Sequence, residues 1–257
     1  MRRDWILPFS IKKGMLVLST PVCTSIIVPA HNEETQLESL IEAVLAATTQ
    51  MDSELIVVND NSSDATGEIA DTLFERYSEV HVVHRTSNNS FGGALKEGID
   101  NATGEFVVPV MADLCDDVAT IPNMVAVAER TGVDFVVGSR YIMGGGTINQ
   151  PLFKGFLSRY YSRLYSFVSG RRITDITNAF KCYRRDVLDG LSIESDWFDI
   201  SVELPSRIIF EKDGHFREVP TTWTGRAVGS SKFNVLHMGR RYFRWLAYAA
   251  RKRLMRG

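Results

Sequence analysis

Residues 106–117, FVVPVMADLCDD, decide the fold class of this chain. They begin as a continuous apolar run, which predicts a central strand buried on both faces of a parallel sheet. They end in three carboxylates, Asp113, Asp116 and Asp117, and ligands of open α/β sheets bind outside the carboxyl ends of the strands. Carboxylate oxygens are hard ligands that suit Mg²⁺ or Mn²⁺, and such an ion can hold a diphosphate. The alternative is that these aspartates cap the next helix and solvate a loop.

The segments on either side of this stretch alternate between strand and helix patterns. Strands are expected at residues 24–29, 54–59, 80–83, 106–113, 133–138 and 216–220. Helices are expected from about Glu33, from Asp64, after the polar loop 88–93, through Val125 and Val127, from Pro151, over 202–210 and over 233–254. The alternation predicts right-handed βαβ units, and therefore an α/β fold with a mainly parallel sheet flanked by helices.

The loop that follows the fifth strand contains three consecutive glycines, Gly144, Gly145 and Gly146. Residues 140–150 are therefore expected to be mobile, because glycine tolerates many backbone conformations. This segment is either a flexible linker or a functional loop that directly follows Arg140.

Composition places the chain among ordinary globular proteins. Its 257 residues are 44% hydrophobic and 23% charged, which suffices for one large domain with a sizeable core. The net charge of −2 gives no indication of a nucleic-acid partner, although residues 219–257 hold nine Arg or Lys and no Asp or Glu. Three widely spaced cysteines, Cys23, Cys115 and Cys182, indicate neither a disulfide framework nor a zinc site, and they fit a reducing compartment.

Membrane-spanning and secretory segments are not expected. No apolar run reaches the ~18 residues of a spanning helix. The opening MRRDWILPFSIKK is basic, but its apolar stretch is short and broken by Pro8, which argues against a signal peptide. The last stretch mixes aromatic residues with arginines on one predicted helix, which favours a segment lying on an anionic membrane surface. The alternative is a helix that packs its apolar side on the domain and exposes its charges.

Polar side chains follow the first two strands where each one ends. The first ends in PAHNE and the second in NDNSSD, so Glu33 and Asp60 lie at neighbouring strand ends and could accept hydrogen bonds from a base or a ribose. The alternative is capping of the two following helices, and both roles can coexist. His31 has no metal-ligating neighbours in sequence and is expected to be a contact or packing residue.

The order of these motifs resembles a known family. IIVPAHNE, VVNDNSSD, VMADLCDD and GSRY followed by GGG resemble the family 2 glycosyltransferases of GT-A fold. DITNAFKCYRRDVL, EVP and RAVGSSK are similar to the dolichyl-phosphate mannose synthase and polyprenyl-phosphate sugar synthase branch. The resemblance implies a GT-A (Rossmann-like) domain at 23–235, between an N-terminal extension at 1–22 and a basic amphipathic helix at 236–257.

The resemblance also implies roles for individual residues. Contacts to the nucleotide-sugar are implied for Pro29, His31, Glu33, Asp60, Ala112 and Asp113, with Asp60 at the base and Asp113 at the metal and diphosphate. Catalytic roles near the phosphates and the acceptor are implied for Asp113, Arg140, Lys154, Arg226 and Lys232, the last two in a mobile basic loop that closes over the donor.

The sequence departs from the family pattern at the expected metal site. Met111 occupies the first position of the DxD element, and Cys115 stands where a metal-binding Gln is frequent. A soft thiol is a poor ligand for Mg²⁺. We therefore expect Mg²⁺ or Mn²⁺ to be held by Asp113 together with Asp116 or Asp117.

Acceptor chemistry separates the candidate functions. A hydroxyl acceptor usually needs a general base, for which Asp199 and Glu203 are the nearest candidates, whereas a phosphate monoester is already anionic and needs only cations to hold it. We predict an inverting enzyme that moves a hexose from a GDP- or UDP-sugar to a polyprenyl or dolichyl phosphate, at the inner face of the membrane and peripherally bound from the cytoplasm. The alternatives are transfer to a saccharide hydroxyl in cell-surface glycan assembly and, because of Met111, a non-catalytic sugar-nucleotide-binding module.

Overall fold

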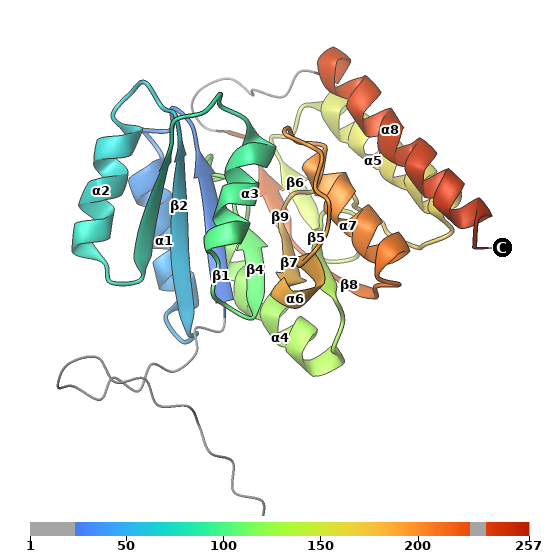
Figure 1. Cartoon of the computed structure of the whole chain (residues 1–257), viewed down its shortest axis with the longest axis horizontal. Helices are drawn as coiled ribbons and strands as arrows, with labels where there is room; N and C mark the ends of the chain where they lie inside the picture. The colour runs from blue at the N-terminus through green and yellow to red at the C-terminus, as the bar shows by residue number, and fades with distance from the viewer. Residues whose placement is uncertain (1–23, 227–234, 257) are drawn as a thin grey trace, which may run out of the picture.

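The computed structural model describes residues 24–226 and 235–256 (Figure 1). The expected N-terminal extension, Cys23 and Lys232 lie outside the described residues.

A seven-stranded sheet forms the centre of the fold, with the strand order β3-β2-β1-β4-β7-β5-β8. The strands are β1 (Thr24–Ala30), β2 (Ser53–Asp60), β3 (Val80–Arg85), β4 (Phe106–Pro109), β5 (Phe135–Ser139), β7 (Lys181–Arg184) and β8 (Phe216–Pro220). Only β7, which the sequence analysis did not predict, runs antiparallel to its neighbours β4 and β5; the other pairings are parallel. The predicted α/β fold with a mainly parallel sheet is therefore confirmed.

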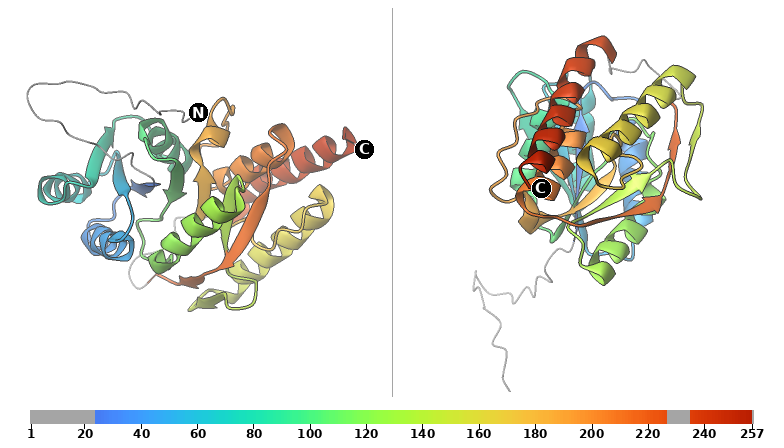
Figure 2. Two further views of the ribbon diagram at one scale, coloured as in Figure 1. Left: turned by 90° about the horizontal axis from the view of Figure 1, so that it is seen from below. Right: turned by 90° about the vertical axis from the view of Figure 1, so that its right-hand side faces the viewer.

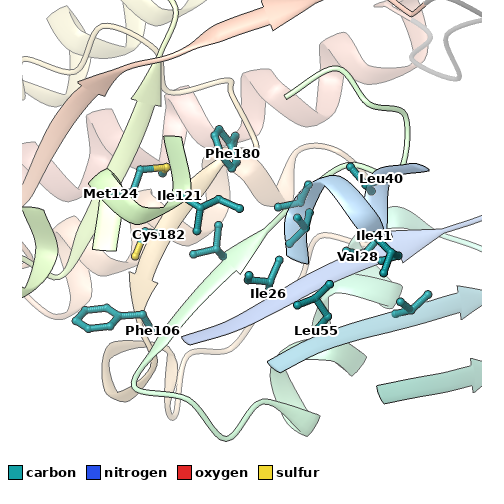
Figure 3. Packing of buried hydrophobic residues seen from close by; sticks show 14 of the residues in the cluster. Ile26, Val28, Leu40, Ile41, Leu55, Phe106, Ile121, Met124, Phe180 and Cys182 are labelled. Carbon is teal, nitrogen blue, oxygen red and sulfur yellow. The ribbon is translucent and has the colours of Figure 1, made fainter. Parts of the chain in front are cut away.

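Helices cover both faces of this sheet. They are α1 (Leu37–Thr48), α2 (Thr66–Arg76), α3 (Phe91–Asn101), α4 (Ile121–Thr131), α5 (Leu152–Ser169), α6 (Arg185–Leu188), α7 (Ile200–Glu211) and α8 (Val235–Leu254), with a 3₁₀ turn η1 (Val118–Thr120). Successive residues of β1 point to opposite faces, so Ile26 packs with α1 and α4 while Ile27 packs with α3. The two faces of the sheet thus carry two hydrophobic cores, the first around Ile26 and the second around Ile27. Figure 3 shows the first core, in which Leu40 and Ile41 of α1 pack with Ile26 and Leu55 of the sheet.

The helices α5 and α8 are neighbours on the β5–β8 side of the molecule (Figures 1 and 2). The hydroxyl of Tyr161 on α5 donates to the carbonyl of Tyr242 on α8 at 2.8 Å, and the two rings meet edge to face. Trp245 of α8 is buried in the second core, beside Tyr165 of α5 and residues of α7. The apolar side of α8 therefore packs on the domain. This is the second of the two arrangements that the sequence left open, and not a helix that turns its apolar side to a membrane.

Three local expectations differ from the structure. The strand predicted at 106–113 ends at Pro109, because the chain turns back beyond Val110 and Leu114 adopts a left-handed backbone with φ of 55°. The loop predicted at 88–93 ends earlier, since α3 begins at Phe91. The loop predicted at 140–150 contains β6 (Gly146–Ile148), which pairs in parallel with β9 (Thr222–Thr224).

Candidate active site

A cavity of about 660 Å³ opens where the carboxyl ends of β1, β2 and β4 meet α5 and α8. The strand order reverses between β1 and β4, and this is the position at which open α/β sheets bind ligands. Ten of the residues expected from sequence line the cavity: Pro29, His31, Glu33, Asp60, Ala112, Asp113, Asp116, Arg140, Lys154 and Arg226. Asp117 is not among the lining residues, and Lys232 lies outside the described part of the chain.

His31 and Asp60 form one corner of the cavity. The Nδ1 atom of His31 lies 2.8 Å from the carbonyl oxygen of Asp60, and its Nε2 atom lies 2.9 Å from the side-chain nitrogen of Asn89. The Asp60 carboxylate accepts the backbone N–H of Ser90 at 2.6 Å and pairs with Arg85. Burial raises the pKa of Asp60, although the Ser90 amide and the Arg85 charge favour its ionised form. Both side chains are thus held in place before any ligand arrives.

Arg226 joins two carboxylates that are far apart in sequence. Its Nε donates to Oδ2 of Asp113 and one terminal nitrogen donates to Oε1 of Glu33, both at 3.0 Å. All three side chains are largely buried and line the cavity. The sequence analysis expects Arg226 at the phosphates and Asp113 at the metal. In the structure these two side chains are bonded to each other.

The three aspartates that end the stretch 106–117 have different surroundings. Asp113 and Asp116 line the cavity, whereas Asp117 is exposed and accepts the N–H of Ala119 at 3.2 Å, which caps η1. Burial, helped by the negative charge of Asp113, raises the pKa of Asp116 to about 7. Burial also raises the pKa of the neighbouring Cys115, which keeps its sulfur a thiol.

The fit of a divalent cation follows from these donors. Within residues 24–226 and 235–256, no group of three or more His, Cys, Asp or Glu side chains is arranged to hold a metal ion. Asp113 and Asp116 nevertheless supply two hard carboxylates to one cavity, and a bound diphosphate would add oxygens of its own. A cation shared between these two residues and a diphosphate fits this donor set, and Asp117 contributes to capping instead.

Arg140 lies at the back of the cavity and is only 9% exposed. Its Nε and one terminal nitrogen donate to the two oxygens of buried Asp175, both at 2.7 Å. The same terminal nitrogen lies 3.1 Å from the hydroxyl of Ser158 on α5 and 3.2 Å from that of Thr177. Asp175 belongs to the DITNAF motif, but its ion pair with Arg140 was not predicted. The charge of Arg140 is therefore matched within the protein.

Lys181 is a buried cation that the sequence analysis also missed. Its ammonium group donates to the carbonyl oxygens of Ile176 at 3.0 Å, of Ser201 at 3.1 Å and of Asn178. Burial lowers the pKa of Lys181 to about 7. These bonds tie the loop that contains Asn178, a lining residue, to the first turn of α7. Lys181 is the first residue of the mostly buried strand KCYR. A lysine in such a strand needs hydrogen-bond partners inside the protein, and this is the signal by which the sequence could have indicated it.

The two candidate general bases have structural partners. Glu203 accepts the backbone N–H groups of Glu194 at 2.8 Å and Ser195 at 2.6 Å, and Arg207 at 2.7 Å. Asp199 accepts the hydroxyl of Ser195 at 2.6 Å and the indole N–H of Trp245 at 3.2 Å. Neither residue lines the cavity. Glu203 thus holds the segment before α7 on that helix, and Asp199 links the start of α7 to α8.

Aromatic residues of α5, α8 and the segment before α7 form a second wall of the cavity. They are Tyr160 and Tyr161 of α5, Tyr242 of α8, and Trp197 and Phe198 before α7, while Trp223 of β9 lines the cavity beside Asp116. Lys154 of α5 lies in the same wall. The cavity therefore joins a carboxylate-rich side to an aromatic side that carries a lysine.

Comparisons with known proteins place these features in context. The model of a family described as "Glycosyl transferase family 2" matches residues 25–191. A dolichol-phosphate mannosyltransferase of Pyrococcus furiosus is 31% identical over 230 residues, which are 88% of this chain and 62% of that protein. A polyprenol monophosphomannose synthase of Mycolicibacterium smegmatis is 31% identical over 240 residues, or 91% of this chain and 89% of that protein. An undecaprenyl-phosphate mannosyltransferase of Micrococcus luteus is 31% identical over 215 residues, or 81% and 86%.

Solved structures show the same fold. A glucosyl-3-phosphoglycerate synthase of Mycobacterium tuberculosis, in complex with Mn²⁺, UDP and phosphoglyceric acid, superposes with a TM-score of 0.69 over 89% of this chain and 78% of that one. The two sequences are 19% identical, so the likeness concerns the fold alone. The same synthase has also been solved with Mg²⁺ and UDP, with a TM-score of 0.67.

Proposed function

The chain belongs to glycosyl transferase family 2 and is a glycosyltransferase of GT-A fold, and from this premise we propose that it transfers a hexose from a nucleotide-diphosphate sugar to a polyprenyl phosphate, with inversion. Mannose is the favoured sugar, because the three relatives above are named for mannose transfer. The chain covers less than two thirds of the archaeal relative but most of the two bacterial ones, which favours the polyprenyl acceptor that they are named for.

One observation carries the choice of acceptor. Three of the four carboxylates that line the described cavity are engaged by cations: Glu33 and Asp113 by Arg226, and Asp60 by Arg85. A carboxylate that already bonds to a guanidinium must give up part of that contact before it can accept a proton from a hydroxyl acceptor, so it is poorly available as a general base. A phosphate monoester needs no base, since its oxygen is already anionic at neutral pH. The cavity thus suits an acceptor that brings its own charge.

The donor side of the reaction follows from the residues at the strand ends. Asp60 and the neighbouring His31 and Ser90 would contact the base and ribose, as hydrogen-bonding groups held at fixed positions. A Mg²⁺ or Mn²⁺ ion held by Asp113 and Asp116 would, when bound, neutralise the leaving diphosphate. Arg226 would move from these carboxylates to the phosphates, where its charge would stabilise the leaving group.

The acceptor side follows from α5. Lys154 lies in the aromatic wall, where its ammonium group would bind a lipid phosphate that faces the sugar. The aromatic and aliphatic residues around it, Leu157, Tyr161 and Tyr242, would contact the first isoprene units. Arg140 would act indirectly, because its ion pair with Asp175 fixes the position of Ser158 and Thr177 at the back of the cavity.

The location that fits a lipid acceptor is the cytoplasmic surface of an anionic membrane, with peripheral attachment. In the part of the chain that the structure describes, no helix combines the length and the apolar character needed to cross a bilayer.

The test is an acceptor comparison with purified protein. Radiolabelled GDP- and UDP-sugars are each incubated with polyprenyl phosphate or with the matching polyprenol in detergent. We expect label from one donor in the lipid phase with the phosphate, and at least ~10²-fold less with the polyprenol. Equal glycosylation of both lipids would overturn the proposal. Donor binding by calorimetry without transfer to any lipid would indicate a binding module instead.

A second function has one observation in its favour. Asp116 lines the cavity, and burial raises its pKa to about 7, which is the range in which a carboxylate acts best as a general base at neutral pH. Transfer to a saccharide hydroxyl, with Asp116 as the base, is therefore the rival reading. It requires that polyprenol or a saccharide be the better acceptor in the same assay.

A further inference from the structure

A buried ammonium group lies behind one wall of the cavity. The side chain of Lys181, the first residue of β7, has no exposed surface. Its Nζ atom donates to the carbonyl oxygens of Ile176 at 3.0 Å, of Ser201 at 3.1 Å and of Asn178, and the last two residues line the cavity. The three N–H groups of the ammonium are thus all used, and each one meets a backbone carbonyl instead of a carboxylate.

The carbonyl of Ser201 can accept this bond because of a proline one turn later in α7. In an α-helix, the carbonyl of residue 201 would accept the backbone N–H of residue 205. Residue 205 is Pro205, which lies inside α7 and has no N–H to donate. A buried carbonyl without a donor costs free energy comparable to a lost hydrogen bond. Lys181 supplies a donor in its place, so the lysine of β7 and the proline of α7 are complementary.

The other two carbonyls belong to the loop 176–179. Most of this loop lines the cavity, through Thr177, Asn178 and Ala179. The hydroxyl of Thr177 lies 2.6 Å from that of Ser158 on α5, and the side chain of Asn178 donates to the carbonyl oxygen of Gly138 in β5 at 2.8 Å. The ammonium group adds the bond to α7. The loop is therefore held between α5, β5 and α7, and the link to α7 passes through one lysine side chain.

We propose that Lys181 is a positioning residue for sugar transfer, because its ammonium group replaces the helix N–H that Pro205 lacks and thereby fixes the loop 176–179 against α7. Lys181 does not itself line the cavity, so it acts through the loop. A displacement of a cavity wall by ~1 Å is enough to lower a rate ~10²-fold. The choice of acceptor in the assays below rests on the proposed function, whereas the fixing of the loop does not.

Another buried cation, on α7, provides a matched control. Arg207 is 6% exposed and pairs with Glu194, Glu203 and Glu211. None of these four residues lines the cavity. Loss of either cation leaves buried acceptors unpaired, so both losses should destabilise the fold. Only the loss of Lys181 also releases residues that line the cavity.

The first experiment compares Lys181→Met with Arg207→Met in the full chain, with polyprenyl phosphate as the acceptor. We expect both variants to have a lower Tm, but only Lys181→Met to lower kcat, by at least ~10²-fold. The dissociation constant of the donor nucleotide, measured by calorimetry, should be unchanged in both, because His31 and Asp60 form another corner of the cavity. If Lys181→Met does not fold, Lys181→Gln, which keeps two N–H donors on a shorter side chain, is measured with the same expectation.

The second experiment separates the position of the loop from the stability of the fold. Pro205→Ala restores a backbone N–H that can donate to the carbonyl of Ser201, so Lys181→Met/Pro205→Ala should regain part of the lost Tm. Its kcat should stay as low as that of Lys181→Met, because the carbonyls of Ile176 and Asn178 still lack the ammonium. Pro205→Ala alone should keep its kcat, since a carbonyl oxygen can accept two hydrogen bonds.

Amide hydrogen exchange over residues 175–181 reports on the loop without an assay of transfer. We expect exchange to be at least ~10-fold faster in Lys181→Met and unchanged in Arg207→Met. Three results would overturn the proposal: an unchanged kcat in Lys181→Met, an equal loss of kcat in Arg207→Met, or recovery of kcat together with Tm in the double variant. If the unmodified chain transfers no sugar to polyprenyl phosphate, the proposed function fails, and hydrogen exchange alone decides whether Lys181 fixes the loop. Equal exchange in the two single variants would then overturn it.

Discussion

The wall of the cavity formed by the strand ends differs from the wall formed by α5 and α8 in what its side chains contact. On the strand-end wall, Asp60, Asp113 and Arg140 each bond to a partner within the chain before a ligand arrives. On the helical wall, rings line the cavity on one side of α5 while other rings of the same helix are exposed. In the proposed function, the first wall would bind a charged donor in fixed positions, and the second would bind a ligand that arrives from an apolar phase.

This difference separates two kinds of mutational effect. Removing a charge from the strand-end wall leaves a buried partner unpaired, so stability and activity are both at risk. Removing a ring from the exposed side of α5 leaves nothing unpaired inside the protein. Such a change should therefore weaken only the binding of whatever the ring contacts, and not the stability of the fold. The following predictions test this separation, from the largest effect to the smallest.

The strand-end wall is tested most directly by Asp113→Ala. We expect kcat/KM for transfer to polyprenyl phosphate to fall at least ~10⁴-fold, or about 5.5 kcal/mol, because the site would lose both the proposed metal ligand and a partner of Arg226. Circular dichroism should show an intact fold. Asp117→Ala is the control, since Asp117 caps η1 on the surface. If Asp117→Ala lowered kcat/KM as much as Asp113→Ala, Asp113 would have no special role and its assignment to the site would be wrong.

The buried ion pair behind this wall predicts a large effect on stability. Arg140→Ala should lower the free energy of unfolding by about 3–5 kcal/mol, because Asp175 would remain buried without its partner. Arg226→Ala should cost clearly less than Arg140→Ala, since Glu33 and Asp113 line the cavity and can be hydrated there, whereas Asp175 is fully buried. Urea denaturation of both variants measures the contrast. Equal losses would show that the two arginines are held alike.

The two helices of the other wall predict opposite outcomes for the loss of a ring. Trp245→Ala in α8 should cost about 3 kcal/mol of unfolding free energy, as expected for a buried aromatic side chain. Phe156→Ala in α5 should change it by less than about 0.5 kcal/mol, because the ring is exposed. Thermal and urea unfolding of both variants check this. A destabilised Phe156→Ala would show that this side of α5 packs inside the protein.

Titration of Asp116 predicts the smallest of these effects. Its folded-state pKa of about 7 lies above the unfolded value of about 3.9, so its stabilising contribution is complete below the unfolded pKa and is lost as pH rises through 7. Asp116→Asn cannot ionise, and it should gain roughly 1–3 kcal/mol relative to the unmodified protein between pH 5 and pH 8. Urea denaturation at both pH values measures the difference. Parallel pH dependence of the two proteins would argue that Asp116 is already ionised at pH 5.

The sequence predicted the strand-end wall well because its signals are local. The apolar runs of β1, β2 and β4 identify buried strands, and the polar residues that follow them must meet at one edge of a parallel sheet. The partners of those residues were missed because they are distant in sequence. Arg226 is 193 residues from Glu33, and Arg140 is 35 residues from Asp175.

The helical wall was harder to predict for a different reason. A helical stripe of Phe153, Phe156 and Tyr160 has the spacing of a buried face, and periodicity does not reveal which side of a helix faces the core. The sequence analysis assigned the membrane contact to the C-terminal helix because its aromatic residues alternate with arginines. The structure shows that Trp245 and Leu246 of this helix are buried, and only the packing of α7 and α8 decides this.

The bridge from Arg226 to Asp113 and Glu33 also sets up a competition between an internal and an external counter-ion. Any cation that takes over Asp113 must first compensate for the loss of this guanidinium, so by reciprocal coupling the arginine and the metal weaken each other's hold on the same carboxylate. A bound donor diphosphate would relieve this conflict, because it would offer Arg226 a new anionic partner. The enzyme would then bind Mn²⁺ weakly alone and tightly with nucleotide, and an alanine at position 226 would improve the first affinity while impairing catalysis.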